Sequence, residues 1–224
     1  MIENVCVLCR GKSLFHLDLL PDDAQYVIVN RFGNELLDEN ISNKLKDKDI
    51  HHVLSLSREE SQKMIENGDY KTYNINKIVL PYLLETVPGT PSPTEGRNGI
   101  IDVQVLSDKC KDYMYKRGER PDGDTRYAYS APTAGMEAIL YSALDLNAKN
   151  VYIIGMDFYD VGYAYDREFV SEEEAMRRGE DPNMMKDYLT KYILERFEDK
   201  NFFIYTRGNF SSELKNVKVI NFND

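Results

Sequence analysis

The stretch from residue 130 to residue 165 constrains this chain most, because a loop, a helix, a strand and a second loop follow one another there without a gap. After Pro132 and Thr133, small and apolar side chains recur at helical spacing as far as Leu146. Residues 151–155 then form a continuous apolar run, typical of a strand buried on both faces of a parallel sheet. This order predicts half of a nucleotide-binding α/β unit.

Both loops of this stretch are predicted to face a ligand. The first amides of a helix have no partner within the helix and attract phosphate, which applies here to the start at Thr133, Ala134 and Gly135. The two small residues are expected to let the backbone come close to that ligand. Ligands of open parallel sheets lie beyond the carboxyl ends of the strands. The residues expected there after the strand are Asp157, Tyr159, Tyr163 and Tyr165. In the alternative interpretation the tyrosines are packing residues and Asp157 forms a turn.

Further runs of apolar and β-branched residues predict the other strands of this sheet, at residues 4–9, 25–31, 51–58, 77–84, 202–206 and 217–222. Polar groups lie at or just after the ends of the first three runs, and we expect them near the same ligand. These groups are Gly11 and Ser13, Asn30 and Arg31, and Ser55. A turn-forming Asn and a surface Arg remain the alternative for the middle pair. The turn at Gly11 lacks the spacing of a P-loop and the three glycines of a dinucleotide fingerprint, which disfavours nucleoside triphosphates and NAD.

Helices are predicted at residues 59–67, 101–117 and 184–198, where apolar residues recur at helical spacing. The acidic segment 160–182 contains few aliphatic side chains, so it buries little surface and is expected to act as a mobile lid. With 224 residues, of which 42% are hydrophobic, the chain is long enough for one sizeable core. We therefore predict a single α/β domain over residues 1–224, with a mostly parallel, twisted sheet between helices.

Composition excludes several classes of partner. A net charge of −10 argues against nucleic acid or an anionic membrane surface, because both require a clustered basic face. The three cysteines and three histidines do not form a disulfide framework or a convincing metal site, since the adjacent His51 and His52 would point to opposite faces of a strand. No apolar run approaches the length of a membrane span, and no basic leader precedes the first strand. The sequence thus favours a soluble, cytoplasmic protein without a metal.

Two parts of the chain together resemble the bacterial sialyltransferases of the CstII type, glycosyltransferase family 42. The first is the G-x-S-L turn at Gly11 with the Leu-Pro-Asp that ends at Asp22, followed by a strand that ends in Asn30. The second is the turn at residues 133–135 with the later Gly-x-Asp-Phe-Tyr motif at residues 155–159 and a further tyrosine at Tyr165. The resemblance covers these two parts well, the last third loosely and residues 60–125 hardly at all.

The resemblance implies a Rossmann-like domain that binds a CMP-activated sialic acid or a related sugar without a metal and transfers the sugar to a glycan acceptor. Tyr159 and Tyr165 would then hydrogen-bond the leaving phosphate. The matched positions Gly11, Ser13, Asn30, Thr133, Ala134, Gly135 and Asp157 would bind the nucleotide. We expect Arg31 and Ser55 to join them because of their places at the ends of predicted strands. Family members often assemble as tetramers, so a homo-oligomer agrees with the resemblance.

Departures from the family pattern concern the turn and the general base. The family has Asn where this chain has Arg10, and Ser where this chain has Ala134. The family's general-base His lies in a segment that corresponds to residues 182–187 of this chain. Because no histidine follows His52, Asp187 is the candidate base, with Asp157 behind it. A helix-capping or solvated Asp187 is the alternative. Two other functions remain open: a pterin diphosphokinase-like phosphoryl transfer, which would require Mg²⁺, and a non-catalytic nucleotide- or glycan-binding module.

Overall fold

The computed structural model describes residues 2–55, 61, 75–80, 102–110, 133–164 and 182–222. Eight strands form one sheet in the order β5-β4-β3-β2-β1-β6-β7-β8, and every neighbouring pair is parallel. The strands are β1 (Asn4–Leu8), β2 (Gln25–Val29), β3 (Ile50–Val53), β4 (Ile75–Leu80), β5 (Asp102–Val105), β6 (Asn150–Ile154), β7 (Asn201–Thr206) and β8 (Val217–Asn221). The predicted α/β fold with a parallel sheet is confirmed.

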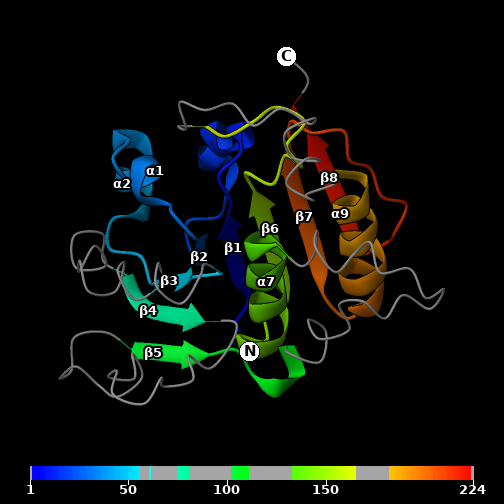
Figure 1. Cartoon of the computed structure of the whole chain (residues 1–224), viewed down its shortest axis with the longest axis horizontal. Coiled ribbons are helices and arrows are strands. Elements are labelled where there is room, and N and C mark those ends of the chain that lie inside the picture. Colours follow the sequence, from blue (N-terminus) through cyan, green and yellow to red (C-terminus); the bar gives the residue numbers. More distant parts are fainter. Residues whose placement is uncertain are drawn as a thin grey trace.

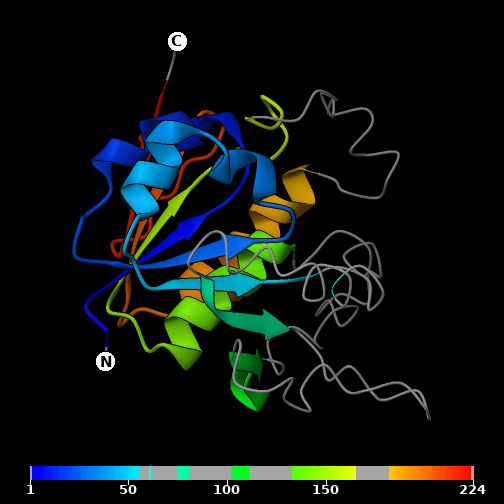
Figure 2. The same cartoon turned by 90° about the vertical axis from the view of Figure 1, so that its left-hand side faces the viewer.

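Helices cover both faces of the sheet, as Figure 1 and Figure 2 show. One face carries α7 (Ala134–Leu140), which continues into the π-helical η2 (Tyr141–Asp145), and α9 (Pro182–Tyr188), which continues into η3 (Leu189–Ile193) and η4 (Leu194–Arg196). The other face carries the 3₁₀ helix η1 (Lys12–Leu19), α1 (Gly33–Leu36) and α2 (Glu39–Leu45). The result is a sheet between two helical layers.

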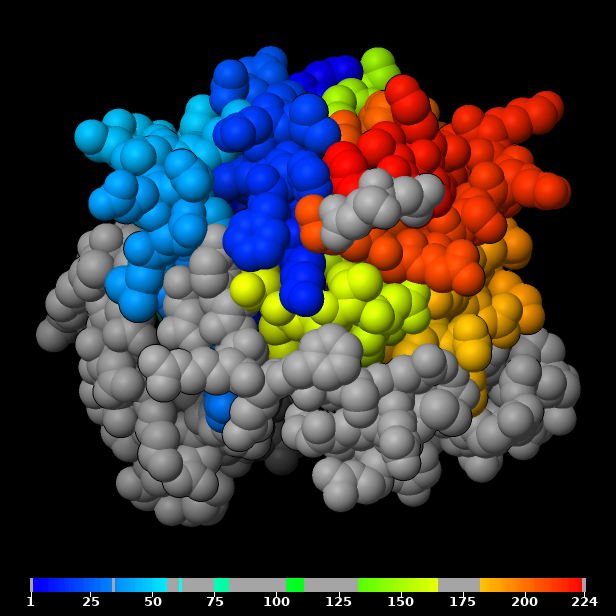
Figure 3. Space-filling model, turned by 90° about the horizontal axis from the view of Figure 1, so that it is seen from above, coloured from blue at the N-terminus to red at the C-terminus, as the bar shows by residue number. Residues whose placement is uncertain are grey.

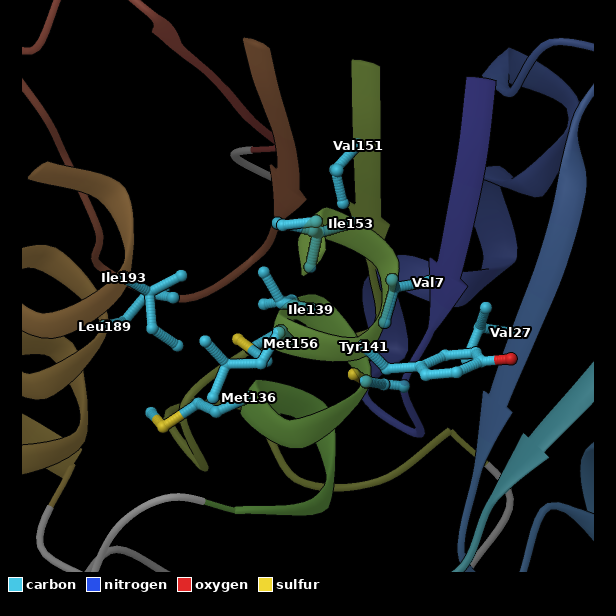
Figure 4. Packing of buried hydrophobic residues seen from close by; sticks show 14 of the residues in the cluster. Val7, Val27, Met136, Ile139, Tyr141, Val151, Ile153, Met156, Leu189 and Ile193 are labelled. Carbon is cyan, nitrogen blue, oxygen red and sulfur yellow. The ribbon is translucent and has the colours of Figure 1, made fainter. Parts of the chain in front are cut away.

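Strand side chains alternate between two hydrophobic clusters, which explains the continuous apolar runs. In β1, Val5 and Val7 belong to the cluster with α7 and α9, whereas Cys6 and Leu8 belong to the cluster with η1 and α2. Figure 4 shows the first cluster, in which α7 residues such as Ile139 pack between the central strands and η3. Burial on both faces requires an apolar side chain at nearly every strand position.

One prediction of secondary structure is wrong. The segment 101–117 was expected to be helical, but β5 occupies its start and pairs with β4 from Lys77↔Asp102 to Leu80↔Val105. Edge pairing to an existing strand overrides the weak helical periodicity of this segment. Residues 108–110 are helical, and residues 111–117 lie outside the described residues.

Other predictions fall partly or wholly outside the described residues. The predicted helix 59–67 is described only at residue 61, and the predicted strand 77–84 only as far as residue 80. The expected lid 160–182 is described at residues 160–164 and 182, so its mobility remains a prediction. The predicted helix at 184–198 is confirmed, with Met185, Tyr188, Leu189 and Ile193 buried on its inner side.

Candidate functional site

The sheet has a topological switch point at β1, whose two neighbours are β2 on one side and β6 on the other. At the carboxyl ends of these three strands lies a cavity of about 140 Å³. Its lining residues come from distant parts of the chain, namely residues 9–11, 29–30, 133–136, 155–159, 162–163 and 185. Such switch points are the usual ligand sites of open α/β sheets. Gly11, Asn30, Thr133 and Tyr159, predicted from separate motifs, all line this one cavity.

The turn after β1 is tied to the end of β6. The Gly11 amide donates to the Gly155 carbonyl at 2.7 Å, and the Gly155 amide donates to Ser13 Oγ at 2.8 Å. A Cβ at position 11 would lie 2.5 Å from Asp157 Oδ2, so only glycine permits this approach. Ser13 is fully buried and does not line the cavity. The G-x-S motif therefore shapes the cavity wall.

Asp157 is buried, and both of its carboxylate oxygens accept hydrogen bonds from the protein. Oδ2 accepts from the Ser13 amide at 2.7 Å, whereas Oδ1 accepts from the Arg207 amide at 2.9 Å and from Thr206 Oγ1 at 3.1 Å. The carboxylate thus connects η1, the exit of β6 and the end of β7. This arrangement makes Asp157 a structural clamp at the edge of the cavity, because the carboxylate ties these three segments together with both of its oxygens.

Asn30 is held in a fixed orientation at the end of β2. Its backbone has φ of 45°, its Oδ1 accepts from the Ser55 amide at 2.8 Å, and its carbonyl accepts a hydrogen bond from His52 Nε2. Burial lowers the pKa of His52 to about 4, which keeps this imidazole neutral. With Oδ1 so engaged, the Nδ2 amide of Asn30 has no hydrogen-bond partner in the described part of the chain. Of its predicted companions, Arg31 is exposed and neither it nor Ser55 lines the cavity.

The start of α7 forms another wall. Thr133 is the N-cap residue but makes no side-chain capping bond, and Ala134 and Gly135 line the cavity after it. A Cβ at Gly135 would lie 2.6 Å from Met156 Cε and 2.8 Å from Cys9 Sγ. Glycine at this position therefore lets α7 pack closely against the ends of β1 and β6, and the approach of a ligand to its backbone stays a prediction.

The loop after β6 has an unusual backbone. Phe158 and Tyr159 are consecutive non-glycine residues with left-handed φ values of 53° and 62°. Such conformations are costly and gather at functional sites. The Tyr163 hydroxyl donates to the Tyr159 hydroxyl at 3.4 Å, with the two rings edge to face. Tyr165, the second predicted phenol, lies outside the described residues.

Arg10 was not predicted as a site residue, yet it lines the cavity. Its Nε donates to Glu35 Oε1 at 2.8 Å, and its guanidinium lies 4.9 Å from the centre of the Tyr163 ring. The backbones of the two segments also pair, since the Ala164 amide donates to the Arg10 carbonyl at 2.7 Å and Gly11 bridges to Tyr163. In Figure 3 the yellow region, which includes residues 155–164, lies beside blue residues of the N-terminal part of the chain. An arginine directly after a buried strand was the available signal in the sequence.

Asp187, the predicted base, lies on α9 and does not line the cavity. It forms an ion pair of 3.0 Å with Lys191 one turn later. None of the chain's three histidines lines the cavity either: His51 and His52 are buried within β3, and His16 stacks on Phe222. Within the described ranges, no cluster of three or more His, Cys, Asp or Glu side chains could hold a metal ion.

Comparisons with known proteins identify the fold. No protein-family model and no curated protein matches the chain. Among solved structures, a variant of the sialyltransferase CST-II in complex with CMP matches with a TM-score of 0.61 and 18% identity, covering 100% of this chain and 89% of that one. CST-II with a trisaccharide acceptor and CMP matches with a TM-score of 0.58 and 19% identity, covering 99% and 89%.

The sialyltransferase CstII from Campylobacter jejuni in complex with the substrate analogue CMP-3FNeuAc also matches, with a TM-score of 0.58 and 18% identity over 96% of this chain and 87% of that one. The parallel sheet with its switch-point cavity gives this chain a Rossmann-like α/β fold. More particularly, the chain has the CstII-type sialyltransferase fold. None of the helices in the described segments is long and apolar enough to cross a membrane.

Proposed function

We propose that this protein is a glycosyltransferase that binds a CMP-activated sialic acid or related sugar in the switch-point cavity and transfers the sugar to a glycan acceptor. One observation carries the proposal: Gly11, Asn30, Thr133 and Tyr159 converge on a single cavity in a chain with the CstII-type fold. The similar structures contain CMP, a CMP-sugar analogue or a trisaccharide acceptor. The donor is the substrate, and the proposed reaction uses no metal and no further cofactor.

The geometry of Asn30 supports nucleotide binding. Because Oδ1 accepts from the Ser55 amide, the Nδ2 group is oriented as a pair of donors at the cavity wall. Carbonyl and hydroxyl oxygens of a pyrimidine nucleoside are suitable acceptors for it. Binding of the nucleotide would hold the sugar in line with the acceptor hydroxyl and so lower the entropic part of the barrier.

In the proposed reaction the acceptor hydroxyl oxygen forms a bond to the anomeric carbon, while the bond from that carbon to the phosphate oxygen breaks. The CMP phosphate leaves with the electron pair, and the hydroxyl proton goes to a base. Hydrogen-bond donors placed beforehand stabilise the charge that develops on the phosphate. The residues at the start of α7 and Tyr159 line the cavity. We assign this role to the amides of the former and the hydroxyl of the latter, together with Tyr165.

The general base is proposed from the two carboxylates Asp157 and Asp187. Both oxygens of Asp157 accept protein hydrogen bonds, so Asp187 remains the proposed base only if its ion pair with Lys191 opens in the complex. This observation favours a second candidate function, a nucleotide-binding module without transferase activity. The two candidates share the same cavity and differ in whether a donor sugar is cleaved.

The test is calorimetry with CMP, CDP, ATP and NAD, each with and without Mg²⁺, followed by mass spectrometry of a CMP-sugar incubated with glycan acceptors. Metal-free CMP binding and an acceptor that gains the mass of the sugar support the transferase. CMP binding without cleavage of any donor supports the module, and Mg²⁺-dependent ATP binding supports the phosphoryl-transfer alternative against the glycosyltransferase. For the mechanism, Tyr159→Phe should lower kcat by roughly 100-fold, as for loss of one donor to a developing anion, with little effect on CMP affinity.

A further inference from the structure

Arg10 differs from the other residues of the cavity in its charge. Among the described residues that line the cavity, it is the only one with a cationic side chain, and Asp157 is the only one with an anionic side chain. The negative charge of Asp157 is already stabilised by three protein donors. Arg10 is therefore the cationic side chain that an anionic ligand would meet among the described residues of this wall.

The position of Arg10 is fixed from three sides. Its Nε donates to Glu35, whose side chain is completely buried in α1, and its guanidinium lies over the Tyr163 ring. Its carbonyl accepts from the Ala164 amide. Arginine loses less rotational entropy on binding when such contacts already restrain it.

The ion pair between Arg10 and Glu35 has its cationic member on the side of the cavity. Arg10 lines the cavity and Glu35 does not, although the two side chains carry equal and opposite charges. Ligand in the cavity therefore faces the positive end of this pair. The Arg10 side chain is 13% exposed, so solvent screens its field only weakly. In a chain with a net charge of −10, this local cation would offset the general repulsion of an anionic ligand.

We infer that Arg10, positioned by Glu35, binds the phosphoryl group of the nucleotide in the cavity and makes the site select a nucleotide over its nucleoside. The inference rests on the proposed function in that it takes CMP as the nucleotide. A guanidinium binds phosphate oxygens through parallel, charge-assisted hydrogen bonds. The alternative is that the pair with Glu35 only ties the turn after β1 to α1.

The experiment compares the affinities of CMP and cytidine by calorimetry. The variant Arg10→Gln/Glu35→Gln removes both charges, so no unpaired carboxylate is left buried. We expect it to lower the CMP-to-cytidine affinity ratio by roughly 10- to 100-fold, the value of hydrogen bonds to a charged group. Cytidine affinity should change by less than about twofold. Arg10→Lys should retain part of the ratio, because it keeps the charge and loses the planar fork.

The matched control is Lys149→Gln/Glu3→Gln. This variant also removes one cation and one anion, but from an exposed pair of 3.5 Å beside the amino ends of β6 and β1, at the opposite end of the strands. Its affinity ratio should equal that of the wild type. Near-ultraviolet circular dichroism verifies that each variant is folded, and a variant that lost cytidine and CMP binding in equal proportion would show a structural role and overturn the inference.

Further arms separate this inference from the proposed function. If CMP binds and the ratio survives in the Arg10 variant, the inference is wrong and the transferase proposal stands. If CMP fails but UMP, AMP or GMP binds with a ratio that depends on Arg10, the inference stands and the proposed donor is wrong. No binding by any of these pairs overturns both. If the variant loses affinity for a free nonulosonic acid while the CMP-to-cytidine ratio is unchanged, Arg10 binds the sugar carboxylate, which also contradicts the inference.

Discussion

Replacing Asp157 by Asn tests whether this carboxylate holds the cavity together. The amide is nearly the same size, but one oxygen becomes an NH₂ group that must face a donor, either the Ser13 amide or the Arg207 amide with Thr206 Oγ1. At least one buried hydrogen bond to a charged group is lost and one backbone amide is left without an acceptor. Each of these effects costs roughly 1–3 kcal/mol, and they overlap because both come from the same lost contact, so we expect a loss of about 2–4 kcal/mol.

The assay is reversible unfolding in urea, followed by circular dichroism, with thermal melting as a second measure. For a chain of this length a loss of that size lowers Tm by roughly 4–15 °C. The control is Asp187→Asn, which weakens an ion pair between the half-buried Asp187 on α9 and the exposed Lys191 on η3. Pairs of this kind contribute about 0.3–0.5 kcal/mol. The two variants make the same chemical change, so their difference measures the environment.

If the free energy of unfolding of Asp157→Asn were within about 0.5 kcal/mol of the wild type, the structural role of this carboxylate would be refuted, because surface substitutions have effects of that size. It would mean that the Ser13 and Arg207 amides find other acceptors at no cost. Asp157 would then become available as the general base, and the proposed assignment of Asp187 would lose its support. A large loss of stability would leave Asp157 as the structural residue.

Three further predictions concern separate features. Gly155→Ala should destabilise the fold by about 3 kcal/mol or more, because the residue has φ of 77° and a Cβ would lie 2.2 Å from the Cys9 carbonyl oxygen. The control is Gly33→Ala, where an added Cβ would meet no atom within 4 Å, and it should be neutral or stabilising in the same urea assay. Burial lowers the pKa of His52 to about 4, below its value of roughly 6.5 in the unfolded chain, so the free energy of unfolding should be highest above pH 6.5 and fall by about 3 kcal/mol towards pH 4. This pH dependence should be weaker in His52→Gln. Its absence from the wild type would mean that the imidazole is protonated in the folded protein as easily as in the unfolded chain. Burial also raises the pKa of Cys9 to about 12, so iodoacetamide should label this thiol in urea and not in the native protein; rapid native labelling would contradict its buried position.

The sequence by itself determined the strands and their two-sided burial. Apolar runs such as residues 4–9 and 151–155 leave a strand little choice except the centre of a parallel sheet. Polar residues directly after such runs must then lie at one edge, which is why Gly11, Asn30 and Tyr159 were found together. These features depend on local pattern, and local pattern is what a sequence displays.

Only the tertiary structure decided which partner each polar side chain has. The carboxylate of Asp157 meets amides 144 and 50 residues away, and Arg10 meets Glu35 across 25 residues. The strand β5 likewise forms because β4 offers it an edge, despite a sequence that suggested a helix. Hydrogen bonds and ion pairs act over a few ångströms, so their choice depends on which distant segments the fold brings into contact. Spacing along the chain does not encode that choice.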